Sequence, residues 1–123
     1  MIPAGIEVEI VDELRPAAEA ALAAVGVDEG HIAIALVSEK EIQTLNRDFR
    51  GLDRPTDVLS FPVDEAGLSA GPRELGDVVI CPEHTEDLAE AVVHGVLHLC
   101  GYDHETDAGE MLALQDRVMK GLA

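Results

Sequence analysis

HGVLHLCGYDH, residues 94–104, holds three of the five histidines of the chain. His94 and His98 are four residues apart, so on a helix both side chains project from the same face, one turn from each other. Gly101 stands where such a helix would end in a left-handed residue, a conformation that glycine takes without strain. The chain can then reverse and bring His104 back toward the first two histidines.

Three imidazoles in this spacing predict a metal site. Three neutral histidine ligands leave the fourth position of a tetrahedral zinc ion open, which a catalytic zinc needs for water or substrate. We therefore expect one zinc ion on His94, His98 and His104. The alternative, two core-facing histidines and an unrelated loop histidine, is disfavoured because spacing, turn glycine and histidine density all agree.

The same spacing occurs in the metzincin proteases, whose run is H-E-x-x-H-x-x-G-x-x-H. Gly95 stands where those proteases carry the catalytic glutamate. The pattern thus keeps the metal ligands and lacks the base of a peptidase, which argues against a metallopeptidase.

The first two histidines are expected on a helix that Thr85 caps. Its polar residues step by three and four and form one stripe, Asp87, Glu90, His94 and His98. Apolar residues cover the other sides, so the helix is buried nearly all round and its polar stripe must open onto a cleft. The metal site would lie at the C-terminal end of this helix.

The rest of the chain alternates strands and helices. We expect strands over 6–10, 31–37, 58–61 and 77–80, and helices over 16–25, 38–50 and 107–122. Ser38 and Glu41 form a capping box for the second helix, which would point Ile42, Leu45 and Phe49 inward. Asp107 and Glu110 look like a capping pair for the last helix, with Met111, Leu114, Val118 and Leu122 on its inner face. Residues 63–74 read as a mobile loop.

Composition limits the cellular compartment and the binding partners that we expect. The 123 residues predict one domain, 1–123, and the two cysteines without a signal peptide indicate a reducing cytoplasm. Charges interrupt every apolar stretch, so we expect no membrane segment. The net charge of −17 argues against a polyanionic partner. Half of the eight Lys and Arg residues nevertheless cluster within fifteen residues, as Lys40, Arg47, Arg50 and Arg54.

Three motifs together resemble one family. Residues 94–104 are similar to the signature of the YbeY family, bacterial single-strand-specific endoribonucleases that act in rRNA maturation. Residues 45–62, LNRDFRGLDRPTDVLSFP, resemble the family segment L-N-x-x-[YF]-R-x-x-D-x-P-T-[ND]-V-L-S-F-P, and residues 75–80, LGDVVI, resemble its L-G-D-[IV]-x-I strand. The match stays in register from about Ile34 to the C-terminus.

The resemblance implies an α+β fold, a mixed sheet of about four strands with helices packed on it. It implies a zinc-like ion on the positions matching His94, His98 and His104, and a functional arginine matching Arg50. The expected activity is metal-dependent cleavage of single-stranded rRNA in ribosome maturation. Ribosomal proteins or assembly GTPases are further candidate partners, and no nucleotide cofactor is expected.

The chemistry of the residues agrees with this resemblance. A histidine-bound zinc lowers the pKa of its water or polarises a phosphoryl oxygen as a Lewis acid. Arg50, between a helix end and a glycine turn, could hold developing phosphoryl charge bidentately, and Arg47 and Arg54 are candidate substrate-binding cations. The alternative is a ribosome-assembly factor that binds ribosomal proteins and rRNA with a mainly structural zinc, because the acidic surface suits basic partners.

Overall fold

The computed structural model describes residues 5–9, 12–27, 29–62, 74–102 and 107–122. Its four strands form one mixed sheet in the order β1-β2-β4-β3. They are β1 (Gly5–Glu9), β2 (Glu29–Leu36), β3 (Val58–Pro62) and β4 (Glu74–Ile80). β1, β2 and β4 run parallel, and β3 pairs antiparallel with β4 along one edge of the sheet. The expected mixed sheet is confirmed. Residues 63–73 of the predicted loop 63–74 lie outside the described residues, and Glu74 is the first residue of β4.

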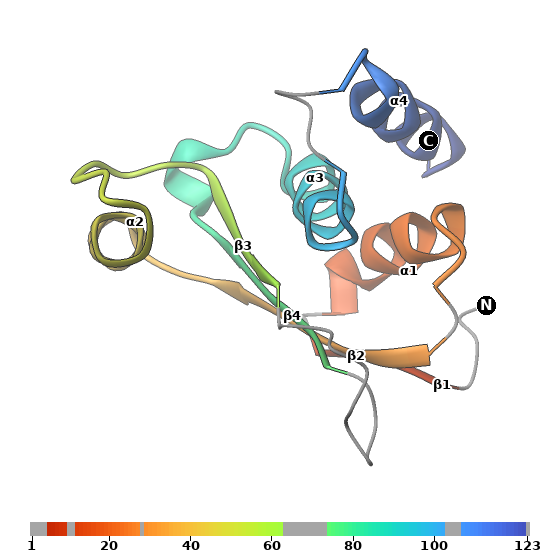
Figure 1. Ribbon diagram of the computed structural model, residues 1–123, viewed down its shortest axis with the longest axis horizontal. Helices are drawn as coiled ribbons and strands as arrows, with labels where there is room; N and C mark the ends of the chain where they lie inside the picture. The colour runs from red at the N-terminus through yellow and green to blue at the C-terminus, as the bar shows by residue number, and fades with distance from the viewer. Residues whose placement is uncertain (1–4, 10–11, 28, 63–73, 103–106, 123) are drawn as a thin grey trace.

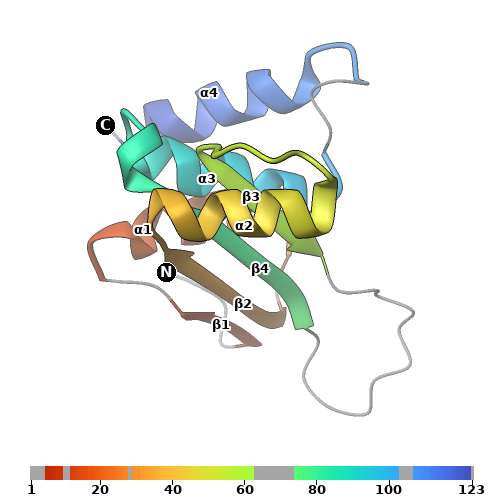
Figure 2. The same ribbon diagram turned by 90° about the vertical axis from the view of Figure 1, so that its left-hand side faces the viewer.

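Helices cover both faces of the sheet, as Figures 1 and 2 show. On one face lie α1 (Arg15–Ala24), α3 (Leu88–Leu99) and α4 (Glu110–Leu122), with α4 packed against both of the others. On the other face lies α2 (Glu39–Arg50). The predicted α+β class, a mixed sheet with helices packed on it, is confirmed. None of the described helices is both long and apolar enough to cross a membrane.

The core is divided by the sheet because successive strand residues point to opposite faces. In β4, Val78 belongs to the larger cluster under α1, α3 and α4, whereas Val79 belongs to a smaller cluster under α2. The larger cluster is almost wholly aliphatic, as the scarcity of aromatic residues requires; its fully buried members include Leu22, Ile32, Val92, Val96, Leu97 and Met111. The helix that carries the histidines thus rests on the main core.

Helix α2 begins at the predicted capping box. The Ser38 hydroxyl accepts a hydrogen bond of 3.1 Å from the backbone N–H of Glu41, whose carboxylate accepts one of 3.3 Å from the N–H of Ser38. The helix ends at Gly51, which has a φ of 73°. The expectation that Phe49 points inward is wrong, since 68% of it is exposed. Phe49 stands in the last turn, where its ring packs edge-on against Phe61 of the edge strand and leaves its other side in solvent.

Helix α3 is capped by Asp87 and not by Thr85 as predicted. The Asp87 carboxylate accepts a hydrogen bond of 3.1 Å from the N–H of Glu90. Thr85 follows a short 3-10 helix, η2 (Pro82–His84), and its hydroxyl donates to the carbonyl oxygen of Cys81 at 2.7 Å. Threonine and aspartate are both good caps. The hydroxyl of Thr85 is already bonded to the 3-10 turn before the helix, so the cap is Asp87.

Helix α3 approaches the sheet closely at Gly95. A Cβ placed on Gly95 would overlap Cγ1 of Val78 and come within 3.1 Å of Cγ2 of Val58. The hydroxyl of Ser60 donates to the carbonyl oxygen of Gly95 at 2.8 Å. Glycine is therefore required at this position by packing, and position 95 faces the sheet.

Candidate metal centre and the cavity beside it

His94 and His98 lie side by side on α3, as their spacing predicted. Both side chains are half-buried, and their ring centroids are 4.7 Å apart with the ring planes at 75°. Gly101, just beyond the helix, has a φ of 101°. The N–H of Tyr102 donates back to the carbonyl oxygen of Leu97 at 3.1 Å, so the chain turns after the helix in the expected way. The third predicted ligand, His104, lies outside the described residues.

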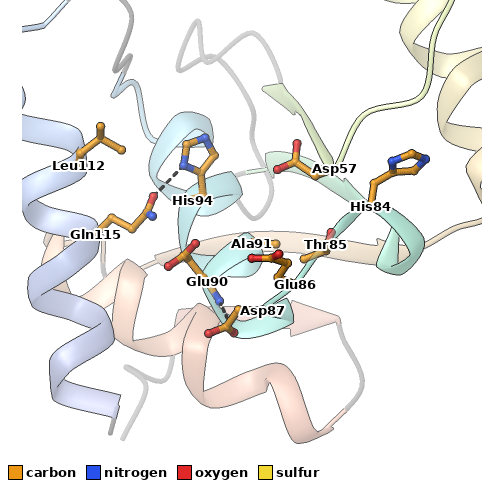
Figure 3. Close-up of a pocket in the computed structure, with 10 residues that line it drawn as sticks. All are labelled: Asp57, His84, Thr85, Glu86, Asp87, Glu90, Ala91, His94, Leu112 and Gln115. Atoms are coloured by element: carbon orange, nitrogen blue, oxygen red, sulfur yellow. Dashed lines mark hydrogen bonds between the residues drawn. The ribbon is translucent and has the colours of Figure 1, made fainter.

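One ring nitrogen of His94 is held by a residue that the sequence did not suggest. Nδ1 of His94 lies 2.7 Å from Oε1 of Gln115 on α4, a contact drawn in Figure 3. An amide oxygen only accepts hydrogen bonds, so this contact favours the proton on Nδ1 and, in the neutral imidazole, a lone pair on Nε2. Gln115 lies on the helical stripe of Met111, Val118 and Leu122. A polar residue on that otherwise apolar stripe was the one sequence signal that could have identified Gln115.

The described residues fit part of a zinc site. Zinc accepts imidazole nitrogens, and a ligating histidine commonly donates its other N–H to an oxygen acceptor, as His94 does here. Within the described residues, no group of three or more His, Cys, Asp or Glu side chains could hold a metal ion. The ligand set of His94, His98 and His104 therefore stays a prediction.

A cavity of about 530 Å³ opens beside His94 (Figure 3). Residues from three helices and two connecting segments line it: Asp57, His84, Thr85, Glu86, Asp87, Glu90, Ala91, His94, Leu112 and Gln115. Three of the four residues of the predicted polar stripe are among them, which confirms that this side of α3 faces a cleft. The lining contains four carboxylates, and among the described lining residues there is no Lys or Arg. The cavity thus favours cations over anions.

Contacts between the connecting segments hold this wall in place. His84 lies with Nε2 2.8 Å from the Glu39 carboxylate at the start of α2. Cys81 donates its backbone N–H to the carbonyl oxygen of Asp57 at 2.8 Å. The Asp57 carboxylate in turn accepts from the N–H of Val58 at 2.8 Å. His84 is exposed and also borders the cavity.

The predicted arginine is not in the cavity wall. Arg50 is exposed at the end of α2, across the sheet from α3. Among the described residues, Arg50 does not line the cavity. Asp57, at the end of the loop that follows Arg50, does line it. The other two predicted substrate contacts, Arg47 and Arg54, are exposed as well; Arg47 pairs with Asp48 at 3.1 Å.

The loop between α2 and β3 is tied to the helix by one buried side chain. Asn46 is 2% exposed, and its amide N–H donates to the carbonyl oxygen of Arg54 at 2.9 Å. The backbone N–H of Leu52 donates to the carbonyl oxygen of Asn46 at 3.3 Å. Asn46 therefore fixes the path along which the chain passes from Arg50 to the cavity wall at Asp57.

Comparison with known proteins agrees with these motifs. Residues 5–123 match the sequence model of the family described as endoribonuclease YbeY. The chain belongs to the YbeY family. The endoribonuclease YbeY of Azorhizobium caulinodans is 44% identical over 86% of this chain and 77% of that protein. That of Persephonella marina is 38% identical over 89% of this chain and 81% of that protein.

A solved structure supports the same assignment. The solution structure of a protein from Thermotoga maritima is 32% identical, with a TM-score of 0.54, and the match covers 94% of this chain and 87% of that one. The family predicted from residues 45–62, 75–80 and 94–104 is confirmed. The predicted enzyme class, an endoribonuclease associated with rRNA processing, is confirmed with it.

Proposed function

We propose that this chain cleaves single-stranded rRNA during ribosome maturation, with one zinc ion held by His94, His98 and His104. The observation that supports the metal is the pair of half-buried imidazoles on α3, with Nδ1 of His94 bonded to Gln115 at 2.7 Å. When bound, the ion supplies Lewis acidity toward a phosphoryl oxygen and lowers the pKa of a water molecule. The acidic wall beside His94 helps to attract such a cation.

Arg50 is the proposed stabiliser of phosphoryl charge. β3 is an edge strand of the described sheet, so among the described strands none lies beyond it. The loop 51–57 leads along this edge from the end of α2 to the cavity at Asp57. An RNA strand lying along this flank would contact both the cavity and Arg50. A guanidinium holds two phosphate oxygens at once, and its charge offsets the negative charge that develops during cleavage. Arg47 and Arg54, exposed on the same segment, would hold neighbouring phosphates.

A ribosome-assembly factor with a mainly structural zinc is the second candidate. The net charge of −17 and the four carboxylates of the cavity favour it, because such a surface attracts basic proteins such as ribosomal proteins and repels RNA. In the nuclease, the metal ion and the arginines between Arg47 and Arg54 must therefore supply the local positive charge.

Cleavage of one RNA sequence, offered as a single strand and as a duplex, separates the two functions. We expect the zinc-loaded protein to cut the single strand only, to stop after a chelator has removed the metal, and to recover when zinc is restored. The assay must cover low and moderate salt, because the repulsion between the acidic chain and RNA is strongest at low salt. A protein that cuts neither RNA under any of these conditions, yet supports ribosome assembly in cells, is the assembly factor.

A further inference from the structure

We propose that Gln115 is a positioning residue of the metal centre, which fixes the tautomer and the ring orientation of His94 so that Nε2 is the nitrogen that would bind a metal ion. This inference rests on the proposed zinc site and adds to it a residue from α4. The geometry behind it is the hydrogen bond of 2.7 Å between Nδ1 of His94 and Oε1 of Gln115, seen in Figure 3.

Gln115 is held in place by the core packing of its helix. Met111, one turn earlier, is fully buried, and Val118, one turn later, is 7% exposed. Both belong to the core cluster that also contains the buried residues of α3. The half-buried Gln115 between them therefore has little choice of direction, and its amide meets α3 at His94.

The chemistry of imidazole makes this contact consequential. A neutral histidine carries its proton on either nitrogen, and only the nitrogen without the proton can bind a metal. An amide oxygen at Nδ1 stabilises the proton there and assigns the lone pair to Nε2. The ring of His98, with its centroid 4.7 Å away, packs edge-on against the His94 ring and limits its rotation. Residues of this kind typically change metal affinity 10- to 100-fold when they are removed.

Gln115 provides a neutral hydrogen-bond acceptor in a cavity wall that already holds four carboxylates. A glutamate at 115 would keep an oxygen opposite Nδ1, whereas a methionine would keep the length of the side chain and lose the acceptor. These two substitutions therefore separate hydrogen bonding from packing. Leu112, one turn earlier on α4, lines the same cavity and is 49% exposed, so Leu112→Ala is the matched control.

The first measurement is the tautomer of His94 in the metal-free full chain, by long-range proton–nitrogen NMR at a pH where the imidazoles are neutral. We expect the proton on Nδ1 in the wild type, in Gln115→Glu and in Leu112→Ala, and a shift of the proton toward Nε2 in Gln115→Met.

The second measurement is zinc affinity by competition with a chelator. Gln115→Met should lose about 10- to 100-fold, Gln115→Glu should bind at least as tightly as the wild type, and Leu112→Ala should stay within about twofold of it, because Leu112 has no part in holding His94.

The outcomes distinguish this inference from the proposed function. An unchanged tautomer and an unchanged zinc affinity in Gln115→Met overturn the role of Gln115 and leave the zinc site standing. A wild type that binds no zinc overturns the zinc-dependent function, and the NMR comparison then decides by itself whether Gln115 sets the tautomer. Should Gln115→Met fail to fold, Gln115→Asn gives the decision, because its shorter amide cannot reach Nδ1 and should cause the same shift.

Discussion

Ser60 on the edge strand donates a hydrogen bond of 2.8 Å to the carbonyl oxygen of Gly95, in the middle of the helix that carries the histidines. This bond crosses from sheet to helix backbone because Gly95 has no side chain to keep the two apart. Val78 lies directly beneath, so the sheet meets the helix at its backbone. The height of His94 and His98 above the sheet is set by this contact.

Gly95→Ala should lower the free energy of unfolding. The added methyl overlaps the branched, buried side chain of Val78, and overpacking of this kind costs about 1–3 kcal/mol. The gain of about 1 kcal/mol that alanine brings to a helix offsets only part of this cost. Denaturant unfolding measures the difference. Gly121→Ala on α4, where a Cβ meets nothing within 4 Å, is the control and should not destabilise. Equal effects at both positions, or no relief of Gly95→Ala by Val78→Ala, would contradict the packing argument.

Ser38→Ala should cost about 1 kcal/mol of stability by leaving the N–H of Glu41 without its cap. Ser38→Asp should restore most of the loss, since aspartate is as good a cap as serine. Thermal or denaturant unfolding monitored by circular dichroism compares the three proteins. An alanine variant as stable as the wild type would mean that the capping box contributes nothing measurable here.

His98→Ala should remove most of the zinc, whereas His84→Ala should keep about one equivalent. His84 lines the cavity but is exposed and paired with Glu39, whereas His98 stands beside His94. Metal analysis of the purified proteins after dialysis gives the comparison. A variant lacking both His94 and His98 that still binds one full equivalent would show that the ion lies elsewhere.

Arg50→Glu should lower the rate of single-stranded RNA cleavage on the order of a hundredfold or more, with zinc content and fold unchanged. Arg50→Lys should be nearly as slow, since lysine cannot reproduce the two-pronged contact of a guanidinium. Arg117→Glu, at an exposed position of α4, changes the net charge by the same amount and should have a small effect. If Arg117→Glu is as slow as Arg50→Glu, general repulsion explains the loss and the specific role of Arg50 is wrong.

The zinc-loaded protein should not hydrolyse casein or unfolded peptides, because no carboxylate occupies the position that a peptidase needs beside its first histidine. Release of labelled fragments, with and without chelator, is the measurement. Metal-dependent peptide cleavage that disappears in His98→Ala would restore the peptidase interpretation.

Local patterns predicted local structure well. The capping box at Ser38, the turn glycine at 101 and the shared face of His94 and His98 all follow from residues within one or two turns of each other. The family motifs extended the prediction to the mixed sheet, which periodicity alone does not define.

Contacts between distant segments were the part that sequence patterns missed. Gln115 meets His94 from twenty-one residues away, and only the docking of α4 on α3 creates that pair. The exposure of Phe49 likewise depends on the edge position of β3. The choice of Asp87 over Thr85 as the cap depends on the 3-10 turn before it. The roles of His104 and Arg50 stay predictions.

The direction of position 95 has an evolutionary consequence. The likeness to the metzincin run suggests that one substitution, Gly95→Glu, separates the two chemistries, yet here that residue would point into Val78 and Val58 and not toward the cavity. Acquiring a glutamate would first require smaller residues in two strands and a helix lifted off the sheet, and each intermediate would be less stable. In this chain the packing of the core therefore opposes a glutamate at position 95, whatever metal ligands the helix carries.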